Sequence, residues 1–201
     1  MAEPDVYILA ERALADVIDQ IRPDQWQQRK PEWFATGGQG DASLREIVNY
    51  HAYDSAWVPD VLSGRTIAEV GDVHEGIKTD ADVDYRAYSE SAIAAARELA
   101  DADRLVHLSY GDFPAREYLK HITSFRGFRA VDIARWIGVD TRLPADLVQG
   151  MWDELAPEME AWRAMGVYGP AVPVPDEAPL QDRLLGLAGR DPLAATGTGT
   201  G

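Results

Sequence analysis

Two histidines, His51 and His121, lie on the apolar stripes of two segments with helical periodicity. An imidazole on such a stripe needs a partner, and two facing helices can supply one as a shared metal ion or a bound ligand. Asp54, one turn after His51, has a carboxylate that can orient the imidazole, join it in coordination or be solvated at the surface. Each histidine can equally be a core residue bonded to a hydroxyl or carbonyl group. These residues therefore predict a candidate metal site at His51 and His121, with Asp54 as a further ligand, beside a purely structural alternative.

A second set of polar residues on the His121 segment is suited to holding a substrate. Arg126 and Arg129 are predicted to point toward the interior, where a guanidinium group requires an anion. That anion is either Asp132, in a structural ion pair, or the carboxylate of a bound molecule. Tyr118 either fills space or donates a hydrogen bond. Arg129, Arg126 and Tyr118 are therefore the candidate substrate-binding residues, and no residue is assigned a catalytic role.

The composition of the chain limits the binding partners and the cellular compartment that can be expected. The 201 residues, 46% of them hydrophobic, suffice for one domain, and a formal net charge of −15 argues against nucleic acids and anionic membranes as partners. Because the chain has no cysteine, a metal would be bound by nitrogen and oxygen, and any thiol chemistry would need a small-molecule cosubstrate. Neither a signal peptide nor a stretch of membrane-spanning length is recognisable, so a cytoplasmic location is expected.

Hydrophobic periodicity predicts an all-α fold with no strand. Residues 105–108 are expected to form a short connection, Asp112 to cap the helix that follows, and 64–84 to be a long crossover loop. The prolines of 169–175 predict an extended strap around the helices. A single domain is expected over 1–190, followed by a disordered glycine and threonine tail over 191–201. The helices are expected at about 5–21, 43–62, 85–102, 114–138, 144–166 and 180–187.

Three stretches carry a family resemblance that spans nearly the whole chain. They are residues 43–51 (SLREIVNYH), the VDIAR sequence at 131–135 and the ending at 169–187. Together they resemble a superfamily that comprises the DinB-like proteins and the N-terminal domain of mycothiol-dependent maleylpyruvate isomerase. The ending is the most specific of the three, and it is similar to that of an actinobacterial subgroup of metal-binding members.

This resemblance implies a four-helix bundle of up-down-down-up type with an extra C-terminal helix and the proline-rich strap. It also implies a divalent metal (Zn, Ni or Fe), held by one histidine of the second helix and by two ligands spaced four residues apart on the fourth. An open coordination position would activate a low-molecular-weight thiol such as mycothiol for a transferase or isomerase reaction on a small molecule. Related bundles pair, so a homodimer is expected.

The chain departs from the family pattern at the ligand positions themselves. His51 matches the first ligand, but Phe125 and Arg129 fall where the paired ligands should be. In a shifted register His121 takes the first place of the pair and Phe125 the second, which still leaves the set one ligand short. Two functions therefore stay open. One is a metal- and thiol-dependent enzyme with a degenerate site, and the other is a non-catalytic bundle that has lost its metal and binds a small molecule or a protein.

Overall fold

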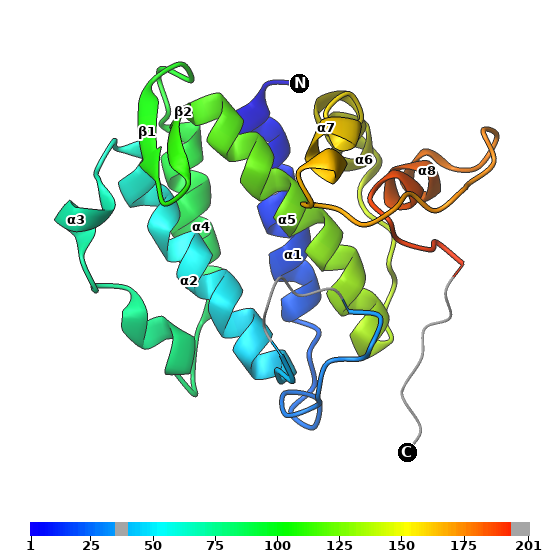
Figure 1. Ribbon diagram of the computed structural model, residues 1–201. Helices are drawn as coiled ribbons and strands as arrows, with labels where there is room; N and C mark the ends of the chain where they lie inside the picture. Colours follow the sequence, from blue (N-terminus) through cyan, green and yellow to red (C-terminus); the bar gives the residue numbers. More distant parts are fainter. Residues whose placement is uncertain (35–39, 194–201) are drawn as a thin grey trace.

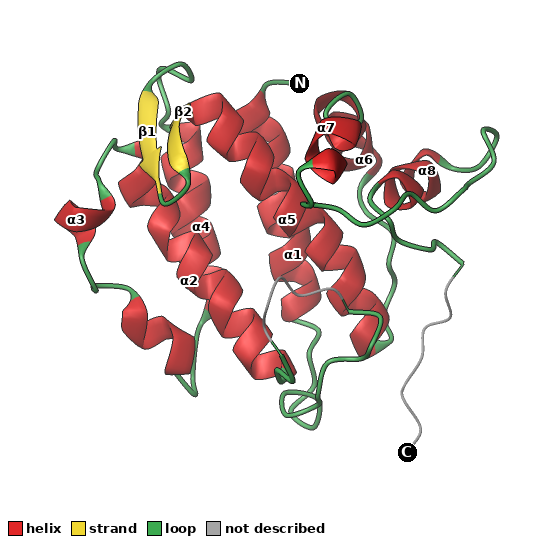
Figure 2. Ribbon diagram, in the orientation of Figure 1, coloured by secondary structure: helices red, strands yellow, loops and turns green. Residues whose placement is uncertain are grey.

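The computed structural model describes residues 1–34 and 40–193, and most of them are helical (Figure 1, Figure 2). The mostly helical fold predicted from the sequence is confirmed, with one small hairpin as the exception. No helix within these two ranges is long and apolar enough to cross a membrane. The predicted tail lies, from residue 194 on, outside the described residues.

In chain order the elements are α1 (Glu3–Ile18), α2 (Leu44–Leu62), α3 (Ile67–Val70), the 3₁₀ helix η1 (Glu75–Thr79), α4 (Tyr85–Arg97), β1 (Leu105–Leu108), β2 (Gly111–Pro114), α5 (Ala115–Ile137), α6 (Ala145–Leu155), α7 (Met159–Ala164) and α8 (Leu180–Leu187).

The long helices α1, α2, α4 and α5 enclose the main core. α1 packs against α5 and α4, and α2 packs against α4 (Figure 1). Buried apolar residues such as Leu14, Ile47 and Ile133 come from three of these helices. Within the described chain, α2 and α5 are not a closely packed pair. The contact between α2 and α5 therefore depends on long side chains that reach from one to the other.

The N-terminus of α2 forms as its sequence predicts. The hydroxyl of Ser43 accepts a hydrogen bond from the backbone N–H of Glu46 at 3.2 Å, and the Glu46 carboxylate accepts one from the Ser43 N–H at 2.7 Å. This reciprocal capping box satisfies two backbone donors and sets where the helix begins. With the start of α2 fixed in this way, His51 lies on the side of the helix that faces the interior.

The crossover that follows α2 is more ordered than the expected loop, since it contains α3 and η1. The Asn49 side chain donates hydrogen bonds to the carbonyls of Lys78, at 3.3 Å, and Asp80, at 2.7 Å. The His74 side chain is only 15% exposed, and its Nε2 lies 2.8 Å from Oδ2 of Asp60. These long-range contacts, which no local pattern signals, hold the crossover against α2.

The expectation of no strand was wrong at residues 105–114. β1 and β2 pair in antiparallel register, with Val106 opposite Phe113. Asp112, which was expected to cap α5, instead lies in β2, and Pro114 is the residue that precedes the helix. The Oδ1 atom of Asp112 is 2.9 Å from Nδ1 of His107 on the other strand. Gly111, at φ 138°, adopts a conformation that other residues rarely take. Strands of four residues are too short for a clear alternation of apolar and polar residues, so the sequence pattern does not indicate the hairpin.

The C-terminal part forms a further layer beside α1 and α5, where α6 packs against both helices and against α8. The single helix expected over 144–166 is divided into α6 and α7, because Pro157 interrupts it. α8 occupies the predicted residues, and the strap before it has no regular secondary structure, as expected. The Val172 N–H donates to the Gly186 carbonyl at 2.9 Å, which joins the strap to α8.

We predict that Gly186→Ala loosens the strap. A Cβ atom at position 186 would lie 2.5 Å from Cγ2 of Val174 and 2.7 Å from the Val172 carbonyl oxygen. Because the second atom belongs to the backbone, relief requires the strap to move, at a cost of about 2 kcal/mol. Urea unfolding and the rate of proteolysis within residues 169–180 measure the effect. Gly76→Ala, where a Cβ atom has no neighbour within 4 Å, is the control and should change neither quantity.

Candidate functional site

The guanidinium group of Arg126 is the centre of the polar interior. Its side chain, on α5, is 1% exposed. Nε donates to Oε2 of Glu11 at 2.8 Å, Nη1 to Nδ1 of His51 at 3.0 Å, and Nη2 to the hydroxyl of Ser55 at 3.1 Å. Arg126 therefore connects α5 with α1, through Glu11, and with α2, through His51 and Ser55.

Glu11 is completely buried and makes an ion pair with Arg126. Its carboxylate accepts three further hydrogen bonds, from the hydroxyls of Tyr7 at 3.0 Å, Ser55 at 2.9 Å and Tyr85 at 2.6 Å. Burial, followed by the charge of Glu11, raises the pKa of the Tyr7 and Tyr85 phenols, so both remain protonated donors. These four hydrogen-bond donors, one of them the charged Arg126, offset the loss of water around the buried Glu11 carboxylate.

His51 is neutral in this environment. Burial lowers the pKa of its imidazole, and the positive charges of Arg126 and Arg129 lower it further. Because a guanidinium group can only donate, Nδ1 of His51 must be the acceptor, and the proton of the neutral ring is on Nε2. A metal ion at Nε2 would require that proton to move to Nδ1, where it would face the N–H of Arg126. Metal coordination by His51 and its observed hydrogen bond therefore exclude each other.

His121 has different surroundings from His51. Its Nδ1 lies 3.2 Å from the Tyr110 hydroxyl, and its ring contacts those of Phe113 and Trp162 at centroid distances of 5.4 and 5.7 Å. Phe125, at a ligand position of the family pattern, is 53% exposed. Across residues 1–34 and 40–193, no group of three or more His, Cys, Asp or Glu side chains is placed to hold a metal ion. The described residues thus do not fit the three-ligand centre that the family resemblance implies.

Asp54 is the polar group at the edge of the Arg126 network. Its side chain is 36% exposed, and Oδ2 lies 3.9 Å from Nη1 of Arg126, beyond hydrogen-bond distance. Burial raises the pKa of Asp54 to about 6, although Arg126 opposes that shift. The charge of Asp54 raises the pKa of Tyr50, and it adds to the effect of burial on the pKa of Tyr110 and of Tyr118. We call these four residues the Asp54 face, where α2 meets the hairpin and α5.

Arg129 belongs to a second ionic group, nearer the C-terminal strap. Its Nη1 lies 3.5 Å from Oδ2 of Asp132, and its guanidinium carbon lies 4.4 Å from the centre of the Phe34 ring. Arg190, just after α8, donates to both carboxylate oxygens of Asp132 at 2.8 and 3.0 Å. The ion pair with Asp132, one of the two roles considered for Arg129, is therefore observed.

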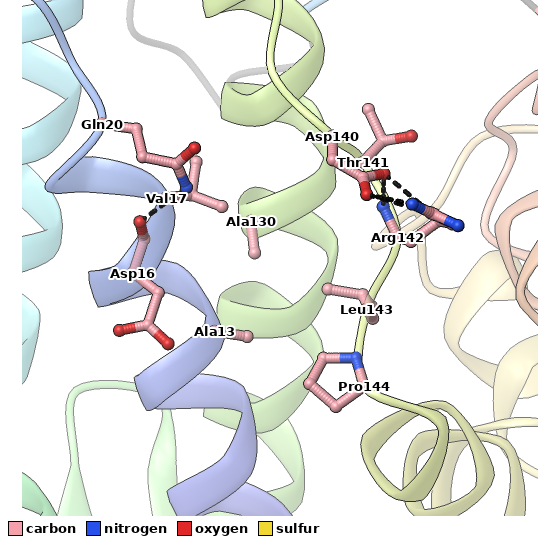
Figure 3. Close-up of a pocket in the computed structure, with 10 residues that line it drawn as sticks. All are labelled: Ala13, Asp16, Val17, Gln20, Ala130, Asp140, Thr141, Arg142, Leu143 and Pro144. Carbon is pink, nitrogen blue, oxygen red and sulfur yellow. Dashed lines mark hydrogen bonds and ion pairs between the residues drawn. The ribbon is translucent and has the colours of Figure 1, made fainter.

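Two cavities lie elsewhere. One, of about 230 Å³, is bounded by α1, α5 and residues 140–144, and the ion pair between Asp140 and Arg142 lies at its edge (Figure 3). The other, of about 330 Å³, lies where α2 and α4 end, near Arg104. None of the candidate residues from the sequence lines either cavity.

Comparison with known proteins yields no match to a family model, a curated protein or a solved structure. The DinB-like resemblance of the motifs therefore stays a prediction, and the site has to be interpreted from its own geometry. That geometry joins His51, Arg126 and Asp54, which the sequence identified, to Glu11, Ser55 and Tyr85, which it did not. The sequence does indicate that Glu11 faces the interior. It lies four residues after Tyr7 and three before Leu14, on the same buried face of α1.

We predict that Glu11→Ala destabilises the protein by about 3 to 5 kcal/mol, because it leaves the buried charge of Arg126 without a counterion. Glu11→Gln should cost less, since an amide oxygen still accepts some of the hydrogen bonds. Denaturant unfolding at pH 7.5 measures both variants, with Glu90→Ala, on the exposed side of α4, as the control. A loss for Glu11→Ala no larger than that of the control would show that the ion pair does not stabilise the fold.

We also predict that Asp54→Asn raises the thermal midpoint at pH 7.5. The pKa of Asp54 is about 6 in the folded chain against an ordinary value of 3.8, so ionising the carboxyl group opposes folding. This penalty is absent below pH 3.8, grows between 3.8 and about 6, and is complete above about 6. The advantage of the variant should therefore disappear as the pH falls through that window. Asp72→Asn, at an exposed position of the crossover, is the matched control.

Proposed function

We propose that this chain is a metal-independent helical-bundle protein that binds a small molecule at the Asp54 face. The independence from metal rests on the 3.0 Å hydrogen bond between Nη1 of Arg126 and Nδ1 of His51. It engages the one lone pair of the neutral imidazole and places a permanent positive charge beside it. A divalent cation at His51 would have to overcome both effects.

The second part of the proposal rests on the chemistry of the Asp54 face. Glu11 neutralises Arg126 at close range, whereas the Asp54 carboxylate is 3.9 Å from the same guanidinium group and is partly open to solvent. It makes no hydrogen bond to any described residue, and phenol groups lie within range of its charge. A carboxylate accepts hydrogen bonds and attracts cations, while phenol rings favour planar or cationic groups. A small organic cation, or a neutral molecule with N–H or O–H donors, is the ligand class that fits.

On this proposal the four long helices α1, α2, α4 and α5 are a DinB-like four-helix bundle whose metal has been lost. The homodimer and the cytoplasmic location expected from the sequence belong to the same hypothesis. The competing function is a metal- and thiol-dependent transferase or isomerase. It would require the Arg126 side chain to withdraw from His51, and no contact of the described residues favours that movement.

Metal analysis separates the two functions. We expect tag-free protein, purified without chelator, to hold far less than one equivalent of zinc, nickel or iron by plasma mass spectrometry. A chelator should leave its thermal midpoint unchanged, because no bound metal contributes to stability. The variants His51→Ala and His121→Ala should contain as little metal as the original protein. A near-stoichiometric metal that disappears in His51→Ala would refute the metal-independent function and favour the thiol-dependent enzyme.

Ligand binding at the Asp54 face is tested with a set of small primary amines, amidines and aryl alcohols in thermal-shift assays at pH 7.5. We expect some of these compounds to stabilise the original protein and to lose that effect in Asp54→Asn. Binding of the cationic ones should also weaken below pH 6, as Asp54 becomes protonated. Asp72→Asn should bind them normally. Equal binding by the two variants, or no binding by any compound, would reject Asp54 as the anchor.

A further inference from the structure

The groups around the Arg126 guanidinium match its shape as well as its charge. Each of its three nitrogen atoms has an acceptor of its own: the carboxylate of Glu11, the imidazole of His51 and the hydroxyl of Ser55, at 2.8 to 3.1 Å. All three acceptors belong to α1 and α2, so none lies on the same helix as Arg126. They are also buried, which shields them from competing water.

We infer that α1 and α2 build a guanidinium-binding site, which the chain fills with its own Arg126 side chain. The carboxylate supplies the counterion, and the imidazole and hydroxyl fix the plane of the group. Recognition of a planar, forked cation differs from attraction of a simple positive charge, because an ammonium group has no fixed fork to match three acceptors. The site should therefore bind an external guanidinium compound once the Arg126 side chain is removed.

The charges of the site explain why a cation must occupy it. Without Arg126, Glu11 keeps its hydrogen bonds from Tyr7, Ser55 and Tyr85 but loses the one ion-pair partner that it has among the described residues. A buried and unpaired carboxylate is strongly unfavourable. The Ser55 hydroxyl has no charge with which to compensate it, and Asp54 adds a second negative charge nearby. A small cation that enters the vacated space restores the balance and stabilises the folded state by linkage.

The test uses the full-length Arg126→Ala variant with methylguanidinium chloride, which resembles the deleted end of the side chain. At about 20 mM, too dilute to denature, the salt should raise the thermal midpoint of this variant by about 3 °C. Methylammonium chloride and cobalt(II) chloride should give a much smaller rise at equal ionic strength. The original protein should not respond to methylguanidinium, because its own arginine fills the site.

Two further variants serve as controls. Arg142→Ala removes an arginine whose side chain is 84% exposed, so it leaves no internal site and should not respond. Glu11→Gln combined with Arg126→Ala lacks the counterion and should lose the effect of methylguanidinium. If Arg126→Ala does not fold alone, its refolding yield from urea in each salt replaces the thermal midpoint. No gain with methylguanidinium, or an equal gain with methylammonium or cobalt, would overturn the inference, while the proposed ligand site at Asp54 could still stand.

Discussion

The buried ion pair between Glu11 and Arg126 is the interaction on which the rest of the interior depends. Removing two charges from water is costly, and the cost is offset only when every polar atom of the pair has a partner. Glu11 meets this condition with donors from α1, α2, α4 and α5, and Arg126 meets it with acceptors from α1 and α2. The requirement links all four long helices through one set of hydrogen bonds, including α2 and α5, whose backbones are not closely packed.

The same ion pair decides the chemistry available to its neighbours. His51 becomes an acceptor with its proton on the far nitrogen, and burial, together with the adjacent positive charges, lowers its pKa and keeps the ring neutral. Asp54 lies just outside hydrogen-bond distance of Arg126, and its carboxylate is partly exposed to solvent. The residues that the sequence suggested as a metal site therefore separate, with His51 in the hydrogen-bond network of Arg126 and Asp54 at the edge of that network. His121 lies outside the Arg126 network, because it contacts Tyr110 of the Asp54 face, through the phenol hydroxyl, and Trp162 of α7.

A second ionic group ties the C-terminal part to α5. Asp132 receives Arg129 from its own helix and Arg190 from beyond α8, while Arg163 donates to the carbonyls of Gly169 and Leu187. The strap carries little regular structure of its own, so these contacts and its hydrogen bond to Gly186 hold it in place. The result is a further layer in which α6 packs against α1, α5 and α8.

Local sequence determined much of the secondary structure. The helices predicted at 43–62, 114–138 and 180–187 appear as α2, α5 and α8, because the capping box at Ser43 and the left-handed Gly138 depend on neighbours a few residues apart. Tertiary structure alone decided the partners of the polar side chains. Arg126 lies 115 residues from Glu11 and 75 from His51, and only the packing of the helices brings them together. Periodicity shows that a polar residue faces inward but not which distant group it meets, and for a buried charge that partner determines its role.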